Sequence, residues 1–271
     1  MSKINVIGAG LAGSEASLYL ANRGYKVDLY EMKSVKMTPA HHSKNFAEIV
    51  CSNSLKSDDE NTASGVLKRE LTLLGSSLID IAYKNKVPAG QALAVDRDAF
   101  SIAVTDLIKN NKNITVHTEE VSSFDPNAVT ILATGPLTSD KMCDAIQSKI
   151  GEEFLYFYDA ASPIISAESI DMSNAFFGAR YKKGDEDYIN CPMDKDEYLK
   201  FYNELINAKT VILHEFEKKN LFESCMPIEI LAKRGVDAIR FGPLKPVGLT
   251  NPHKKDKPYA VVQLRKENKC G

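Results

Sequence analysis

The chain lacks tryptophan, has no long hydrophobic run and carries little net charge. No segment approaches the roughly 18 uncharged apolar residues of a membrane span, and the apolar N-terminus leads into a glycine turn instead of a signal-peptide cleavage site. The formal net charge of -2 argues against nucleic-acid binding through a global field, so an RNA site has to be a local basic strip. We expect a soluble, cytoplasmic protein. Its 271 residues, 44% of them hydrophobic, suffice for one large or two small domains.

Cysteine is also sparse, and its spacing excludes two common uses. The five cysteines are Cys51, Cys143, Cys191, Cys225 and Cys270; their number is odd and no two of them form a CxxC pair. Neither a disulfide framework nor a metal site is therefore predicted. A lone cysteine is most often a small buried hydrophobe. Cys143 on a predicted helix is interpreted as structural, Cys191 before a proline as a packing residue of a turn, and Cys270 in the tail as incidental.

What the sequence does contain is a glycine turn close to its N-terminus. Ile4–Ile7 is predicted to be a short strand, GAGLAG follows at residues 8–13, and a helix then continues to Arg23. Glycines at this spacing make a tight turn, open the backbone to a pyrophosphate and let helix and strand pack closely, with the helix N-terminus facing the phosphates. A second predicted strand ends at Glu31, an acid placed to accept ribose hydroxyls. A bound dinucleotide is predicted; the alternative is a glycine-rich turn without a ligand.

The dinucleotide is predicted to be FAD. Glu31 would repel a 2′-phosphate, which disfavours NADP and leaves FAD or NAD. Three features favour FAD: the position of the turn, a helix that opens at Asp96-Arg97 after a long insertion, and a strand that ends in ATGP at residues 133–136. Arg97 could instead be a solvated residue in the first turn of its helix. The ATGP segment could be an ordinary exit from a strand into a loop. The predicted cofactor-binding residues are Gly8, Ala9, Gly10, Leu11, Ala12, Gly13, Glu31, Arg97 and Gly135.

The rest of the sequence predicts an α/β fold in two parts. Residues 39–57 have no periodicity and are expected to form a long loop, which is uncommon unless functional. Residues 62–83 carry one apolar helical stripe. From about residue 154 the chain consists of short apolar runs between turns. We predict a doubly wound, Rossmann-like FAD-binding domain with a helical insertion at 1–152, a mixed β-rich insertion domain at 153–258, and the start of a return to the FAD domain at 259–271.

Several motifs together carry a family resemblance. Besides the glycine turn they are TPAHHS at 38–43, FAEIVCSNSLKS at 46–57, PAGQALAVDR at 88–97, FYDAA at 157–161, ESCMPIE at 223–229, RFGP at 240–243 and KPVGL at 245–249. With these segments in order from residue 3 to about 265, the chain resembles TrmFO, the folate- and FAD-dependent family that methylates C5 of a uridine in RNA, usually in the T-loop of tRNA. The resemblance is specific, since generic flavoproteins do not share the cysteine and proline segments.

The resemblance implies an RNA (uracil-5-)-methyltransferase. Methylenetetrahydrofolate would be the one-carbon donor, reduced FAD the reductant, and NAD(P)H the source of electrons for the flavin. A cysteine fits this chemistry, because C5 of uracil is a poor nucleophile until a thiolate adds at C6. Cys51 and Cys225 are implied as the catalytic thiols, one as nucleophile and the other assisting, and the assignment between them stays open. The choice between tRNA and ribosomal RNA also stays open.

Basic residues in the second half of the sequence are candidate phosphate contacts for RNA. Their alternative interpretation is a solvated charged face. They are Arg180, Lys182, Lys183, Arg240, Lys245, Lys254, Lys255 and Lys257.

The resemblance also implies a longer protein, whose C-terminal portion completes the flavin site. With the C-terminal part of the FAD domain missing, we expect weak FAD binding and little turnover unless a complementing C-terminal chain supplies the rest. The oligomeric state is open. A non-catalytic RNA- or partner-binding remnant and an NAD-linked oxidoreductase are the rival interpretations.

Overall fold

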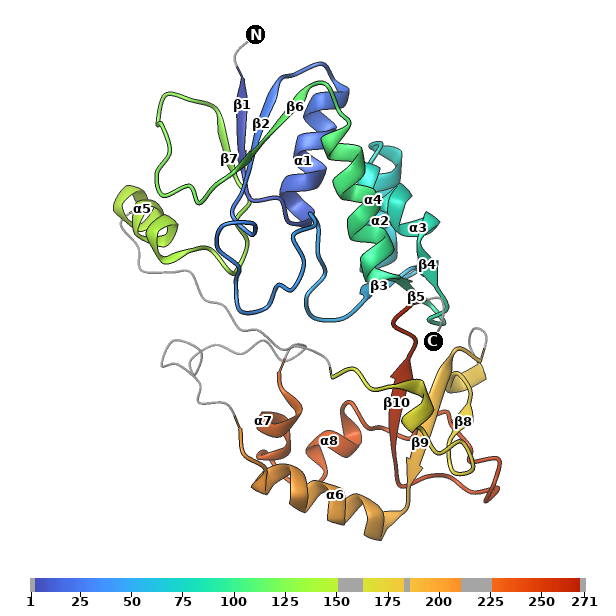
Figure 1. Ribbon diagram of the computed structural model, residues 1–271. Helices are drawn as coiled ribbons and strands as arrows, with labels where there is room; N and C mark the ends of the chain where they lie inside the picture. Colours follow the sequence, from blue (N-terminus) through green and yellow to red (C-terminus); the bar gives the residue numbers. More distant parts are fainter. Residues whose placement is uncertain (1–2, 151–162, 183–185, 211–225, 269–271) are drawn as a thin grey trace. The chain divides into compact units, whose positions relative to one another are not determined.

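The computed structural model describes residues 3–150, 163–182, 186–210 and 226–268 (Figure 1). The chain forms two compact units. The first unit contains residues 1–86 and 93–161, and the second unit contains residues 87–92 and 162–271. No helix among the described residues is long and apolar enough to cross a membrane.

The first unit is built on a four-stranded parallel sheet. Its strand order is β6-β2-β1-β7. The strands are β1 (Ile4–Ile7), β2 (Val27–Glu31), β6 (Ile114–Thr118) and β7 (Thr130–Leu132). β1 pairs with β2 on one side and with β7 on the other. The chain therefore changes direction across the sheet at β1, and in such sheets ligands bind at the carboxyl ends of the strands on either side of that point.

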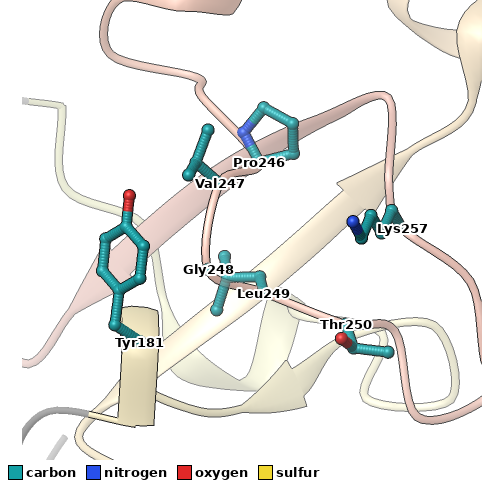
Figure 2. A pocket seen from close by; sticks show the side chains of 7 residues that line it. All are labelled: Tyr181, Pro246, Val247, Gly248, Leu249, Thr250 and Lys257. Atoms are coloured by element: carbon teal, nitrogen blue, oxygen red, sulfur yellow. The ribbon is translucent and has the colours of Figure 1, made fainter.

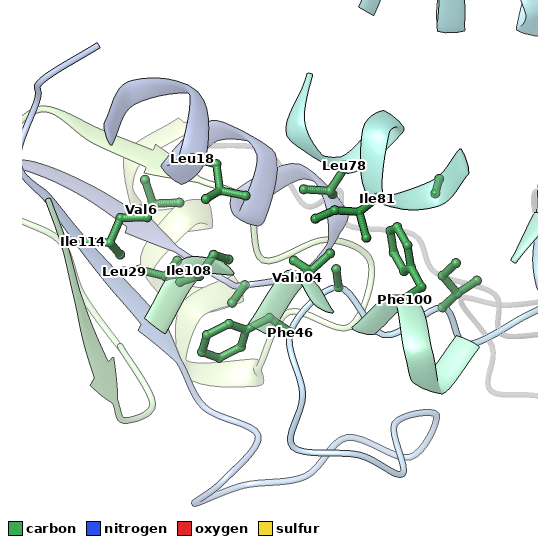
Figure 3. Packing of buried hydrophobic residues seen from close by; sticks show 14 of the residues in the cluster. Val6, Leu18, Leu29, Phe46, Leu78, Ile81, Phe100, Val104, Ile108 and Ile114 are labelled. Atoms are coloured by element: carbon green, nitrogen blue, oxygen red, sulfur yellow. The ribbon is translucent and has the colours of Figure 1, made fainter. Parts of the chain in front are cut away.

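Three helices of the first unit pack against the sheet through one apolar core, namely α1 (Leu11–Asn22), α3 (Ser77–Lys84) and α4 (Arg97–Lys109) (Figure 3). The unit also contains α2 (Ala63–Leu73) and α5 (Asp140–Ile150). Leu18 of α1, Leu29 of β2 and Phe100 of α4 are fully buried in that core. Three short strands, β3 (Ser54–Ser57), β5 (Ala92–Val95) and β4 (Lys86–Val87), form a small sheet in the order β3-β5-β4. The α/β, Rossmann-like fold class predicted from the sequence is confirmed.

The apolar stripe expected over residues 62–83 is divided between two helices. Gly75 adopts φ +80°, the left-handed conformation that ends a helix, and Ser76 caps the next one by accepting from the Ile79 amide. On α2 the stripe faces outward, with Leu67 55% exposed. Lys68 is buried in its place, because its ammonium group donates to the carbonyls of Ser57 and Ser64.

The second unit is an antiparallel sheet with three helices. The strands β8 (Phe176–Phe177), β9 (Tyr188–Met193) and β10 (Ala260–Arg265) pair in the order β10-β9-β8. The helices are α6 (Lys195–Asn207), α7 (Ile228–Ala232) and α8 (Ala238–Phe241). Tyr198 and Ile239 are fully buried at the centre of this unit's core.

The structure divides the chain differently from the domain limits expected from the sequence. Residues 259–271 were expected to begin a return to the first unit, but β10 pairs along its whole length with β9, from Ala260 opposite Met193 to Arg265 opposite Tyr188. Residues 87–92 also belong to the second unit. Strand partners far apart in the sequence decide such limits, and composition alone does not reveal them.

Candidate functional site

The glycine turn between β1 and α1 leaves space at one glycine and none at the other two. A Cβ on Gly8, whose φ is +97°, would lie 2.5 Å from the Ala133 carbonyl oxygen, and one on Gly13 would lie 1.8 Å from the Gly8 carbonyl oxygen. A Cβ on Gly10 would meet no atom within 4 Å. Gly8 and Gly13 are thus required for packing, whereas Gly10 keeps the backbone open on the side where a ligand can approach.

The N-terminus of α1 offers free amides to such a ligand. The first-turn N–H groups of a helix have no carbonyl partner within the helix. The N-cap residue is Gly10, which has no side chain to accept from them, and the first turn carries no acidic residue. The positive end of the helix dipole and the open backbone together favour an anion such as a diphosphate.

Glu31, at the carboxyl end of β2, holds the turn in place. Its Oε2 accepts from the Ala9 amide at 2.9 Å, and its Oε1 accepts from the Lys33 amide at 2.9 Å. A carboxylate oxygen can accept two hydrogen bonds. Glu31 can therefore fix the turn and still accept ribose hydroxyls.

The end of β7 lies against the same turn. The Ala133 amide donates to the Ile7 carbonyl at 2.8 Å, which brings the small residues of the ATGP segment next to Gly8. Gly135 adopts φ +65°, and a Cβ there would meet no atom within 4 Å. The backbone at Gly135 is open, as an approach by a cofactor requires.

We call residues 39–53 the thiol loop, because they contain Cys51. Glu48 organises the loop: its Oε1 accepts from the amides of His42 at 2.8 Å and Ser43 at 3.1 Å. The buried Lys33 ammonium lies 3.3 Å from Glu48 Oε2 and also donates to the Asn45 carbonyl. The loop is therefore fastened to the chain just beyond Glu31.

The thiol loop is also bonded to the glycine turn itself. The Ala47 amide donates to the Ala9 carbonyl at 2.8 Å. The Phe46 amide donates to Thr105 Oγ1 of α4 at 2.8 Å. The backbone of the loop is thus joined directly to the glycine turn and to α4.

Cys51 is exposed between two anchored residues. Ile49 is buried, and Arg97 Nη1 donates to its carbonyl at 3.3 Å. Asn53 is buried, and its carbonyl accepts from the Val95 amide at 2.9 Å. The Cys51 side chain itself is exposed. A fixed backbone with an exposed thiol suits a nucleophile that has to meet a large substrate.

The two other described cysteines are less suited to nucleophilic chemistry. Cys143 and Cys191 are only partly accessible, and burial raises the pKa of each thiol. A raised pKa lowers the thiolate fraction at neutral pH. Cys225 and Cys270 lie outside the described residues, so the structure gives no geometry for the second predicted catalytic thiol.

Alkylation should separate these cysteines. We expect a short pulse of iodoacetamide at pH 7.5 to modify Cys51 several times faster than Cys143 or Cys191, because accessible thiols react in preference to buried ones with raised pKa values. Mass spectrometry of tryptic peptides measures the three rates. If the three cysteines of the folded chain are alkylated at equal rates, the exposed position of Cys51 is contradicted.

The structure brings together most of the predicted site residues, and it shows that Arg97 also contacts the thiol loop. Arg97 was predicted to contact the cofactor, and it donates to the thiol loop at Ile49. The sequence did not point to Lys33 or Glu48. In the sequence, Lys33 is simply a lysine two residues after Glu31, and Glu48 an acid three residues before Cys51. Neither spacing predicts that the two side chains form a buried pair.

The basic residues proposed to contact RNA differ in their availability. Arg240 is engaged within the second unit: its guanidinium donates to the Tyr259 carbonyl at 3.0 Å and stacks on the Tyr259 ring. Arg180 donates to the Lys245 carbonyl at 2.9 Å. Lys183 and the Lys182 side chain lie outside what the structure describes. The remaining lysines are exposed, namely Lys245, Lys254, Lys255 and Lys257.

No group of three or more histidine, cysteine or acidic side chains within the described ranges is arranged to hold a metal ion. The candidate site consists of a glycine turn, an acidic residue at the end of the second strand, and a thiol loop bonded to the turn at Ala9 and to Lys33. These features place the chain among the α/β proteins with a dinucleotide-type glycine turn.

Comparison with known families gives a more specific result. The family model "Glucose inhibited division protein A" matches residues 3–271, and the chain belongs to this family. The chain is 58% identical over 269 residues to the methylenetetrahydrofolate--tRNA-(uracil-5-)-methyltransferase TrmFO of Fusobacterium nucleatum subsp. nucleatum, and 56% identical over 268 residues to that of Listeria monocytogenes serovar 1/2a. Each match covers 99% of this chain. The resemblance to TrmFO is thereby confirmed.

The matched relatives are longer than this chain. It spans about 62% of the length of these two relatives. Among solved structures, that of Aquifex aeolicus GidA in the form II crystal is 20% identical, with a TM-score of 0.37 over 46% of this chain and 21% of that one. A likeness this distant says nothing further about the site.

Proposed function

We propose that the chain binds FAD at the glycine turn and provides the flavin and thiol sites of a methylenetetrahydrofolate-dependent tRNA (uracil-5-)-methyltransferase. The observation that carries the proposal is the open backbone at Gly10 between the closely packed Gly8 and Gly13. It supports a nucleotide-binding turn in a chain that is 58% identical to a TrmFO protein. The relatives' name supports the reaction and the RNA class.

The residues of the turn fit FAD. The amides at the start of α1 would hold the diphosphate, the Glu31 carboxylate would accept ribose hydroxyls, and the open backbone at Gly135 would allow the flavin portion to approach. When bound and reduced, the flavin supplies the hydride that turns a methylene group into a methyl group, and NAD(P)H would supply the two electrons. The nicotinamide reductant is supported by the TrmFO resemblance alone.

Cys51 is proposed as one of two catalytic thiols, with Cys225 as the other. A thiolate adds to C6 of uracil, forming a C–S bond and placing electron density on C5, which then attacks the one-carbon unit of the folate. Loss of the C5 proton together with cleavage of the carbon–nitrogen bond to the folate would leave an exocyclic methylene group at C5. A hydride added to that carbon would give the methyl group and expel the thiolate from C6, which breaks the C–S bond. The exposed Cys51 side chain on an anchored backbone supports this role, and the T-loop of tRNA is the proposed target.

A fluorinated RNA tests the proposed function. Fluorine at C5 prevents the loss of a proton, so the C–S bond to the enzyme should persist as an adduct. We expect the chain, with FAD, methylenetetrahydrofolate and NADH, to form this adduct with a 5-fluorouridine-containing tRNA transcript on a denaturing gel. Cys51→Ser should reduce adduct formation more than about 100-fold if Cys51 is the attacking thiol.

Controls distinguish the rival functions. Cys143→Ser removes a partly buried thiol and should leave the adduct unchanged, and Cys225→Ser tests the second candidate. If neither Cys51→Ser nor Cys225→Ser alters adduct formation, the thiol assignment is wrong. Binding of the transcript without any adduct would favour the non-catalytic alternative, and an adduct with ribosomal but not transfer RNA would favour the other target.

A further inference from the structure

A hollow of about 540 Å³ lies on the surface of the second unit, and all the residues that line it belong to this unit. Its floor is the segment 246–250, between α8 and β10 in the chain. Tyr181 lies on one side of this segment and Lys257 on the other (Figure 2). The volume falls in the range of small-molecule sites.

Tyr181 has an unusual backbone conformation for so large a residue. Its φ of 59° and ψ of 17° are left-handed, a region that a bulky side chain adopts only when its surroundings force it. Tyr181 is 60% exposed, so burial of the side chain does not explain the strain. A strained backbone that holds an aromatic ring exposed beside a hollow indicates a function.

The strained conformation is fixed by the floor of the hollow. The Tyr181 amide donates to the Gly248 carbonyl at 3.1 Å, and Gly248 itself has a φ of 78°. A Cβ on Gly248 would lie only 2.7 Å from the Tyr181 nitrogen. One residue earlier, Arg180 Nη2 donates to the Lys245 carbonyl at 2.9 Å. The two loops are therefore held together before any ligand binds.

The charges around the hollow favour an anion. Lys257 is the charged residue among its lining residues, and no acidic side chain lines it. The exposed Lys245, Lys254 and Lys255 continue the positive charge beyond the hollow. Asp256, between Lys255 and Lys257, is the one acid of the turn at 251–258, so positive charge is in excess there. Several exposed cations near the hollow suit a polyanion better than a single small acid.

We propose that this hollow holds one nucleotide of the RNA substrate, with the base stacked on Tyr181 and its phosphate beside Lys257. An exposed aromatic face and a neighbouring lysine are the two elements by which proteins bind single-stranded nucleotides without reading their sequence. The identification of the ligand as RNA rests on the proposed function. The strained tyrosine and the arrangement of charges are independent of it.

Binding of a fluorescein-labelled, unmodified tRNA transcript, measured by anisotropy at several salt concentrations, tests the inference. Tyr181→Gly relieves the left-handed strain, so the melting temperature of this variant should not fall. The affinity of the variant for the transcript should fall about tenfold, because one stacking contact is lost. Tyr181→Phe keeps the ring and should bind within about twofold of the unaltered chain. Lys257→Gln should reduce the slope of log K against log salt by about one.

Matched controls and outcomes separate this inference from the proposed function. Lys200→Gln removes an exposed charge from α6, and Tyr25→Ala removes an exposed ring from the first unit; both should bind like the unaltered chain. If the unaltered chain binds the transcript and Tyr181→Gly and Lys257→Gln do so equally well, the nucleotide subsite is wrong and the proposed function stands. If the unaltered chain does not bind the transcript, both fail.

Discussion

Replacing Gly10 by alanine should weaken FAD binding at least about 100-fold and leave the folded chain intact. The added methyl group meets no protein atom within 4 Å, and the backbone of Gly10, with φ of -70°, is one that alanine adopts freely. The melting temperature should therefore stay within about 2 °C. The same methyl group would occupy the space assigned to the diphosphate, and overpacking there costs about 3 kcal/mol, equivalent to roughly 100-fold in affinity.

Gly13→Ala is the matched control for this prediction. Its Cβ would lie 1.8 Å from the Gly8 carbonyl oxygen, so the turn itself has to move and the chain should lose stability by about 3 kcal/mol or more. Isothermal titration with FAD and thermal melting distinguish the two variants. If Gly10→Ala binds FAD as tightly as the unaltered chain, the diphosphate does not lie at this turn.

Replacing Lys33 by methionine should destabilise the first unit by about 3 kcal/mol, because it leaves the Glu48 carboxylate in a largely buried position without its charged partner. The side chain of Lys33 is 4% exposed and that of Glu48 is 13% exposed. Urea unfolding measures the loss of stability. Adding Glu48→Gln to Lys33→Met removes the unpaired charge and should recover part of it.

The same variant should loosen the thiol loop. Glu48 accepts from the amides of His42 and Ser43, and it does so from a position set by Lys33. Hydrogen exchange of the peptide that contains residues 42–48 should therefore accelerate in Lys33→Met. Lys36→Met is the control: it breaks an exposed pair with Glu120 and should change neither stability nor exchange appreciably. Unchanged exchange in Lys33→Met would mean that this pair does not organise the loop.

Local sequence signals predicted the elements that depend on neighbouring residues. The helix expected to end before Gly24 is α1, which is followed by Gly24 at φ +87°. Asp194 and Glu197, three residues apart, form a capping box at the start of α6, and Asp96 caps the helix expected to open there, α4. The glycine turn lies between β1 and α1 as expected. In each case the controlling interaction spans only a few residues, so the sequence contains the whole signal.

Features that depend on distant partners were not predictable in the same way. Gly75 and Ser76, which divide the stripe expected over 62–83, are a local signal that the apolar periodicity concealed. The buried side chain on α2 does depend on a partner outside the helix: it is Lys68, because the Ser57 carbonyl accepts from its ammonium group. The pairing of β10 with β9 joins segments far apart in the sequence. The Lys33–Glu48 pair is likewise visible only after the loop has folded back on β2.

A crystal structure of the chain soaked with FAD would show whether the glycine turn binds the cofactor. We expect the diphosphate within hydrogen-bonding distance of the backbone amides at Gly10 and Leu11, the adenosine ribose on the Glu31 carboxylate, and the thiol loop still bonded to Ala9. A nucleotide bound elsewhere, or a glycine turn whose amides are taken up by protein groups at saturating FAD, would contradict this expectation.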